Sequence, residues 1–107
     1  MFRIGVIGGS GLYEMEGLRD VESLKISTPW GDPSDELVKG ILNDTELIFL
    51  PRHGKGHKIT PSEINYRANI YAMKQLEVDW IISVSAVGSM KNEIAPGHIV
   101  IPVKVIY

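Results

Sequence analysis

The stretch TPSEINYRANIYAMKQLEVDWIISV, residues 60–84, decides the fold class of this chain. Its first part predicts a helix over Pro61–Glu77, for which Thr60 can serve as the N-cap. Pro61 suits the first helical position, and Glu63 stands at the reciprocal position of a capping box. Apolar residues recur at helical spacing after this start, so the helix has a broad apolar face of the kind that packs on a sheet.

Short apolar runs bounded by glycine and proline predict strands on both sides of this helix. Trp80–Val84 follows the helix directly, and Leu47–Leu50 precedes it. These two runs and the helix form a candidate crossover unit, which favours an α/β fold. The other runs predicted as strands are Phe2–Ile7, Val21–Thr28, Leu37–Leu42 and Ile99–Ile106.

The composition is that of an ordinary globular domain, and it excludes several classes of protein. The chain has 107 residues, enough for one compact domain. Its 11 Lys and Arg against 13 Asp and Glu give a net charge of −2, so nothing indicates a nucleic-acid surface. It has no cysteine, which excludes disulfide scaffolds and thiolate zinc sites. No apolar run approaches the roughly 18 residues of a membrane span, so we expect a cytoplasmic protein that contacts no membrane.

The last residues, Ile99–Tyr107 (IVIPVKVIY), form one of the most apolar stretches of the chain. A complete domain usually ends in a capped helix or a polar tail. The predicted strand here has no following element to cover it, and its open edge would invite non-native association. We therefore expect this chain to be the N-terminal part of something longer.

The first candidate for a functional site is the loop Gly8-Gly9-Ser10-Gly11, directly after a predicted strand. Glycines let the backbone approach an anion and aim its N–H groups at it, and Ser10 adds a hydroxyl donor. The loop matches neither G-x-G-x-x-G nor G-x-x-x-x-G-K-[ST], so a dinucleotide-binding or P-loop fold is disfavoured. A phosphate or substrate loop and a plain tight turn both remain open.

The second candidate is the segment Pro51–Lys58 (PRHGKGHK). Arg52 offers a bidentate fork and His53 a second donor, so together they can hold an oxyanion. The alternative is a solvated basic loop. His53 and His57 have a spacing that could suit zinc, but the glycines between them argue against one helical face and no third ligand accompanies them. No metal site is therefore predicted.

The third candidate is Val84-Ser85-Ala86-Val87-Gly88-Ser89, where a predicted buried strand ends in small residues. Such strand ends admit ligands in α/β proteins, and small side chains leave room for a flat ring. The alternative is that alanine and glycine only relieve crowding under a helix. All three candidates lie just past apolar strands, so a parallel sheet would gather them at one edge as a site for phosphate and a substrate.

In this order, the segments resemble the methylthioadenosine phosphorylases, within the trimeric purine nucleoside phosphorylase family. The resemblance is collinear over essentially the whole chain, which corresponds to less than half of a typical family member. The matching segments are Ile4–Leu12, Thr28–Ser34, Arg52–Gly54 with His57, Pro61–Ser62, Asn65–Ile70, Ser85–Ser89 and Pro96–Val100.

The resemblance implies a fold and a reaction. Residues 1–107 would be the N-terminal portion of a single nucleoside phosphorylase domain, a mixed sheet flanked by helices. The reaction would be phosphorolysis of 5′-methylthioadenosine to adenine and 5-methylthioribose 1-phosphate, by a trimeric or hexameric homo-oligomer. No organic cofactor or metal is implied, because inorganic phosphate is the co-substrate. 5′-Methylthioinosine or a 6-oxopurine nucleoside remains open as the substrate, and so does an inactive fragment that only binds phosphate or assembles.

The resemblance also assigns site residues. The phosphate would be held by Ser10, Arg52, His53, Ser85 and the backbone of Ala86. Many family members have Thr at the position of Ser10, which keeps the hydroxyl. The base and ribose would be lined by Ala86, Val87 and Gly88, with His57 near the 5′ substituent. The acid that assists departure of the purine lies in the family's C-terminal half, so no catalytic residue is assigned.

Overall fold

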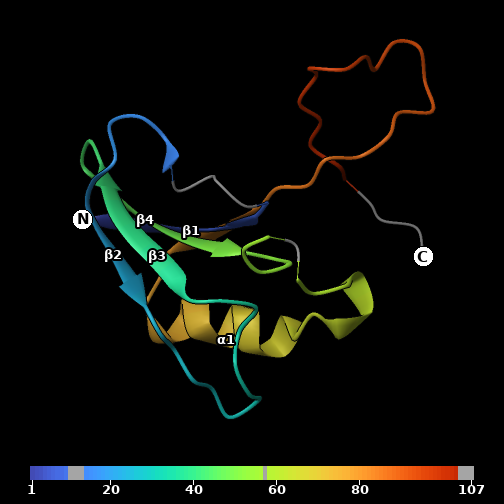
Figure 1. Ribbon diagram of the computed structural model, residues 1–107. Coiled ribbons are helices and arrows are strands. Elements are labelled where there is room, and N and C mark those ends of the chain that lie inside the picture. The colour runs from blue at the N-terminus through green and yellow to red at the C-terminus, as the bar shows by residue number, and fades with distance from the viewer. Residues whose placement is uncertain (10–13, 57, 104–107) are drawn as a thin grey trace.

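A five-stranded mixed sheet carries the fold in the computed structural model, which describes residues 1–9, 14–56 and 58–103 (Figure 1). In sequence order the strands are β1 (Phe2–Gly8), β2 (Arg19–Leu24), β3 (Leu37–Leu42), β4 (Thr45–Pro51) and β5 (Trp80–Ser83). Their spatial order is β2-β3-β4-β1-β5. β1 runs parallel to both β4 and β5, whereas β3 is antiparallel to β2 and β4. The predicted α/β class with a mixed sheet is confirmed.

Most predicted strands are present with small changes at their ends. The matching predictions are Phe2–Ile7, Leu37–Leu42, Leu47–Leu50 and Trp80–Val84. The prediction that the last of these is buried is wrong, because every residue of β5 is exposed and no described element covers it. The predicted strand Val21–Thr28 is shifted, because β2 begins at Arg19 and ends at Leu24. Thr28 then pairs with Gly31 through two backbone hydrogen bonds of 3.1 and 3.0 Å, which makes a turn where the strand was expected.

The predicted strand Ile99–Ile106 is wrong over residues 99–103, which form no strand, while residues 104–106 lie outside the described part. Ile99, Ile101 and Val103 are almost fully exposed. The segment that follows β5 leaves the sheet and arches away from it (Figure 1). An apolar β-branched run forms a strand only where a partner strand accepts its hydrogen bonds, and no described strand lies beside this one.

The single α-helix of the described residues, α1 (Tyr66–Gln75), is shorter than the predicted helix Pro61–Glu77. Thr60 and Glu63 do form the capping box, but it opens a separate 3₁₀ turn, Pro61–Glu63. The backbone is extended at the next residue, so α1 starts afresh with Asn65 as its N-cap, whose side chain accepts a hydrogen bond from Ala68 N. No helix within the described residues is long and apolar enough to cross a membrane.

Helix α1 covers one face of the sheet, and the main core lies between them (Figure 1). Ala72 and Met73 of the helix pack on the side chains of Ile7, Leu37, Ile48 and Leu50. The connection β4–α1–β5 is the predicted crossover, and in it β5 pairs with β1 and not with β4. The crossover therefore passes over β1, and the carboxyl ends of three parallel neighbours, β4, β1 and β5, meet at one edge.

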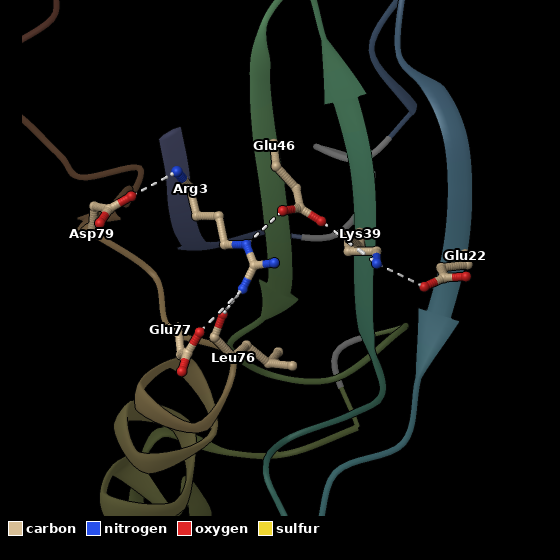
Figure 2. Close-up of polar contacts among 7 residues, drawn as sticks. All are labelled: Arg3, Glu22, Lys39, Glu46, Leu76, Glu77 and Asp79. Carbon is tan, nitrogen blue, oxygen red and sulfur yellow. Dashed lines mark hydrogen bonds and ion pairs between the residues drawn. The ribbon is translucent and has the colours of Figure 1, made fainter. Parts of the chain in front are cut away.

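A polar network joins the amino ends of these strands, at the edge opposite their carboxyl ends (Figure 2). Arg3 of β1 donates from Nε to Glu46 Oε2 of β4 at 2.6 Å and from Nη1 to the carbonyl oxygen of Leu76, at the end of α1, at 2.8 Å. Its backbone N–H donates to Asp79 before β5. Glu46 is only 7% exposed, so its charge depends on these partners. Arg3 thus fastens the end of α1 and the start of β5 to β1.

Lys39 extends this network to the edge of the sheet, where water competes for the same groups (Figure 2). Its Nζ lies 3.5 Å from Glu46 Oε1 and 2.9 Å from Glu22 Oε1. The hydrogen bond with Glu22 is the largest cause that raises the pKa of Lys39. Desolvation lowers this pKa, but the charges of Glu22 and Glu46 add to the rise, so the pKa lies above its ordinary value. Lys39 is therefore a cation throughout the physiological range.

We expect Glu46→Ala to lower the free energy of unfolding by about 2 kcal/mol, because it removes the buried carboxylate 2.6 Å from Arg3 Nε and leaves Arg3 only the exposed carboxylate of Glu77 at 3.9 Å. The matched control is Glu22→Ala at the exposed end of the network, which should cost less than about 1 kcal/mol. Urea unfolding of both variants measures the difference. Equal costs would show that burial of Glu46 adds nothing.

Gly5 of β1 is required by the close approach of α1. A methyl group at this position would lie 2.6 Å from Met73 Sδ, and Met73 is fully buried. We expect Gly5→Ala to destabilise the fold by about 1–3 kcal/mol through overpacking. Gly9→Ala is the control, since its methyl group would meet nothing within 4 Å. Thermal unfolding distinguishes them, and a neutral Gly5→Ala would show that Met73 repacks at no cost.

Candidate functional site

The carboxyl ends of β1, β4 and β5 stand in register at one edge of the sheet. Gly8 is paired with Pro51, and Ile7 with Ser83. Backbone hydrogen bonds continue the pairing one residue further, from Arg52 N to Gly8 O at 2.9 Å and from Val84 N to Ile7 O at 2.8 Å. The structure therefore brings Arg52 beside the start of the Val84–Ser89 segment, as a parallel sheet predicts.

The guanidinium of Arg52 lies across this edge and contacts β5 and the residues after it. Nη1 donates to Ser85 Oγ at 2.9 Å. Nη2 donates to Ser83 Oγ at 2.8 Å, to Val84 O at 3.0 Å and to Ile7 O at 3.2 Å. A guanidinium has five N–H groups, so these four bonds leave at least one donor for an anion. Arg52 and Ser85, two predicted phosphate ligands, are thus in direct contact.

His53 follows Arg52 in a tight loop and is half-buried. Its Nδ1 lies 2.9 Å from Ile59 O, and its own carbonyl accepts a 3.0 Å hydrogen bond from Ile59 N. A carbonyl oxygen can only accept, so Nδ1 carries the hydrogen and the ring is fixed in orientation. Nε2 is then an acceptor in the neutral ring and a donor in the protonated one. His53 can therefore donate to a phosphate through Nε2 only as an imidazolium.

Asp35 holds the loop after His53 in place. Its Oδ2 accepts a 2.8 Å hydrogen bond from Lys55 N, and its Oδ1 accepts one of 2.7 Å from Glu36 N. Partial burial raises the pKa of Asp35, but the two backbone N–H groups and the charges of Lys58 and Lys55 outweigh it, so the pKa lies below its ordinary value. Asp35 thus stays ionised in neutral solution and fixes the turn that carries His53.

A cavity of about 520 Å³ lies away from this edge, on the outer side of α1. Its walls are aromatic and aliphatic with two cations at the rim, and Arg67 stacks 5.2 Å from the ring centre of Trp30. The lining residues are Trp30, Tyr66, Arg67, Ile70, Tyr71 and Lys74. None of them is a predicted site residue, so the presence of a cavity does not by itself identify the candidate site. The chemistry gathers at the strand ends.

Comparison with known families gives a direct result. Residues 3–107 match the family model described as "Phosphorylase superfamily". The chain belongs to this superfamily. The resemblance seen in the sequence is confirmed.

Two curated relatives show one branch of the phosphorylase superfamily to which this chain is similar. The S-methyl-5′-thioadenosine phosphorylase of Geobacter sulfurreducens is 69% identical over 92% of this chain and 35% of its own length. The enzyme of the same name from Chloroflexus aurantiacus is 58% identical over 92% of this chain and 34% of its own. The chain therefore spans about a third of the length of the curated relatives that it matches.

Solved phosphorylase structures share the fold. A methylthioadenosine phosphorylase from an antarctic soil metagenomic library superposes with a TM-score of 0.83 at 57% identity, over 87% of this chain and 32% of that chain. The methylthioadenosine phosphorylase from Schistosoma mansoni, in complex with tubercidin, gives a TM-score of 0.80 at 44% identity, over 91% of this chain and 35% of that chain. The sheet described above is thus the phosphorylase sheet.

The other predicted site residues of this phosphorylase chain fall into two groups. Ser10 and His57 lie outside the described residues. Ala86, Val87 and Gly88 lie in the exposed segment after β5, and Val87 is 85% exposed. Their assignment to base and ribose stays a prediction.

Sequence reasoning missed two residues that shape this edge, Ser83 and Asp35. Ser83 falls within a run predicted as a buried strand. Residues two apart in a strand lie on the same face, so a serine two residues before Ser85 in an apolar run could have indicated a second hydroxyl beside it. Asp35 carries no local signal, because its partner Lys55 is 20 residues away in the chain.

We expect Asp35→Asn to lower the free energy of unfolding by about 0.5–1 kcal/mol near neutral pH, since an amide oxygen accepts the N–H groups less strongly than a carboxylate. The lowered pKa sets the pH dependence. The stabilisation is complete above the unfolded value of 3.8 and is lost as the pH falls through the lower, folded value. The gap between wild type and variant should therefore close in acid.

Asp44→Asn, in the exposed turn between β3 and β4, is the control for this comparison. It should shift the stability by less than about 0.5 kcal/mol at every pH. Urea unfolding between about pH 3 and pH 7 measures all three proteins. A gap for Asp35→Asn that persists unchanged in acid would contradict the assignment.

Proposed function

We propose that this chain supplies the phosphate-binding part of a nucleoside phosphorylase that cleaves 5′-methylthioadenosine. The observation that carries the proposal is the guanidinium of Arg52, held at the ends of three parallel strands in contact with Ser85. The curated relatives named S-methyl-5′-thioadenosine phosphorylase support the choice of substrate. The products would be adenine and 5-methylthioribose 1-phosphate.

In this reaction an oxygen of inorganic phosphate forms the new bond to C1′ of the sugar, and the bond from C1′ to the purine nitrogen breaks. The electron pair of that bond leaves with the base, which gains a proton, while the attacking monohydrogen phosphate gives up its own proton as it becomes the sugar phosphate. Positive charge develops on the sugar in the transition state, so a phosphate dianion held beside C1′ both orients the attack and stabilises that charge. Tight binding of the anion is therefore the contribution that this chain can make.

The residues at the strand ends suit such an anion. Arg52 carries a permanent charge, and its recorded bonds leave at least one N–H group for a phosphate oxygen. Ser85 accepts from Arg52 through its oxygen, so its own hydrogen can donate to the same phosphate. His53, with Nδ1 committed to Ile59 O, would add a donor through Nε2 when protonated. Ser10 and the backbone of Ala86 complete the proposed ligand set.

The finer parts of the proposal rest on the resemblance alone. 5′-Methylthioinosine or a 6-oxopurine nucleoside is the alternative substrate, because the residues that would read the purine belong to the part of the relatives that this chain does not span. An inactive fragment that binds phosphate or assembles is the alternative function. A cytoplasmic location, assembly as a homotrimer or hexamer, and a reaction without metal or organic cofactor also stay predictions.

Arg52→Ala tests the phosphate site. We expect it to weaken binding of inorganic phosphate by about 10- to 100-fold, the cost of losing charge-assisted hydrogen bonds. Arg19→Ala is the matched control, since Arg19 on β2 bonds to Asp20 and to the backbone of Asn43, away from the strand ends. An NMR titration with inorganic phosphate measures the dissociation constants. A wild-type chain that does not bind phosphate would overturn the proposal.

Release of adenine from 5′-methylthioadenosine, with and without phosphate, separates the two functions. Turnover that requires phosphate and is lost in Arg52→Ala supports a phosphorylase site within this chain. Phosphate binding without turnover supports the alternative, a phosphate-binding fragment. Turnover that is independent of phosphate contradicts both.

A further inference from the structure

Ser83, the last residue of β5, contacts the guanidinium of Arg52 and belongs to none of the candidate site segments found in the sequence. Its Oγ accepts a hydrogen bond of 2.8 Å from Nη2, the shortest of the four bonds that this guanidinium makes. On the other terminal nitrogen, Nη1 donates to Ser85 Oγ. Two hydroxyls, two residues apart, therefore hold the two ends of one planar group.

The position of Ser83 is fixed by the sheet and not by Arg52. Ser83 pairs with Ile7 in the parallel ladder, and the next residue donates its backbone N–H to Ile7 O. Arg52 is anchored on the other side by its own backbone bond to Gly8 O. The backbones of Ser83 and Arg52 are thus both held by β1. Their separation is fixed by the sheet, and the hydrogen bond from the guanidinium to the Ser83 hydroxyl joins them.

This contact reduces the conformational freedom that an arginine would otherwise lose on binding an anion. A free arginine side chain has several rotatable bonds and loses rotamer entropy when it is ordered. A guanidinium already held by Ser83 and Ser85 has lost most of that freedom in the unliganded protein, so the anion meets a group that is already oriented. The backbone carbonyls of Ile7 and Val84 also accept hydrogen bonds from Arg52 and support its orientation. These two bonds do not depend on the side chain of residue 83.

We propose that Ser83 is a positioning residue, which holds the guanidinium of Arg52 in the orientation that receives phosphate; the inference rests on the function proposed above. Ser83 acts through Arg52 and needs no contact with the phosphate itself. Its loss should therefore have a smaller effect than the loss of Arg52. The two carbonyl acceptors remain in Ser83→Ala, so the guanidinium is loosened and not released.

The test compares Ser83→Ala, Ser83→Thr and wild type in the full 107-residue chain. We expect Ser83→Ala to weaken binding of inorganic phosphate by about 3- to 10-fold, the range of one net hydrogen bond. Threonine keeps the hydroxyl, so Ser83→Thr should restore the wild-type dissociation constant. Ser27→Ala is the matched control, because it removes an exposed serine hydroxyl that bonds to Asp32 and not to Arg52.

A second measurement separates positioning from a general structural role. Without phosphate, the side-chain ¹⁵N signals of Arg52 should show slowed rotation of the guanidinium in wild type and Ser83→Thr, and averaged signals in Ser83→Ala. Ser83 is exposed, so the thermal midpoint should be the same in all three proteins. A lowered midpoint together with unchanged Arg52 signals would overturn the proposal in favour of a structural role.

The outcomes distinguish this inference from the function on which it rests. Phosphate binding that is equal in wild type and Ser83→Ala overturns the positioning role and leaves the phosphate site intact. A wild-type chain without phosphate binding overturns the proposed function and the role of Ser83 toward phosphate together. In that case, Arg52 signals that differ between wild type and Ser83→Ala would assign Ser83 a contact with the guanidinium only.

Discussion

The parallel pairing of β1 with β4 on one side and β5 on the other is the constraint on which the rest of the structure depends. It places Gly8 beside Pro51 and Ile7 beside Ser83, so three chain segments end together. Because a parallel ladder needs a crossover, α1 must pass over the sheet between β4 and β5. That passage buries Ala72 and Met73 and creates the core. The core and the candidate site are thus two results of one strand arrangement.

Two arginines mark the opposite ends of this ladder, and their surroundings differ in a way that fits their roles. Arg3 is matched by a carboxylate, Glu46, which neutralises its charge beside the core. Arg52 meets only neutral acceptors among its recorded partners, the hydroxyls of Ser83 and Ser85 and two backbone carbonyls. A guanidinium that is oriented but not neutralised keeps its attraction for an anion. This difference in partners is what makes the Arg52 end a candidate binding site and the Arg3 end a structural one.

The second face of the sheet carries a smaller apolar cluster, formed by Val38, Leu47 and Phe49. α1 lies on the other face, and within the described residues no helix covers this one (Figure 1). Trp80 and Ile82 of β5, in register with Ile4 and Val6 of this face, are 65% and 49% exposed. The matched stretch of this chain covers 35% and 34% of the two curated relatives. The candidate site lies where the exposed segment after β5 begins, because Arg52 bonds to Val84 and Ser85.

Hydrophobic periodicity, turn residues and family motifs were enough to predict the mixed α/β sheet, four of its strands and the gathering of the segments that carry Arg52 and Ser85 at one edge. The strands follow from local sequence patterns, and the shared edge follows from parallel pairing. Both can be inferred from the sequence. The break between the 3₁₀ turn and α1 was not predictable in this way, because it depends on the extended backbone at Ile64 and the cap at Asn65. Only the tertiary structure decided that β5 pairs with β1, that Asp35 holds the loop of His53, and that Ser83 holds Arg52. Each of these joins residues far apart in the chain, where no periodicity connects them and only the packed fold sets their distance.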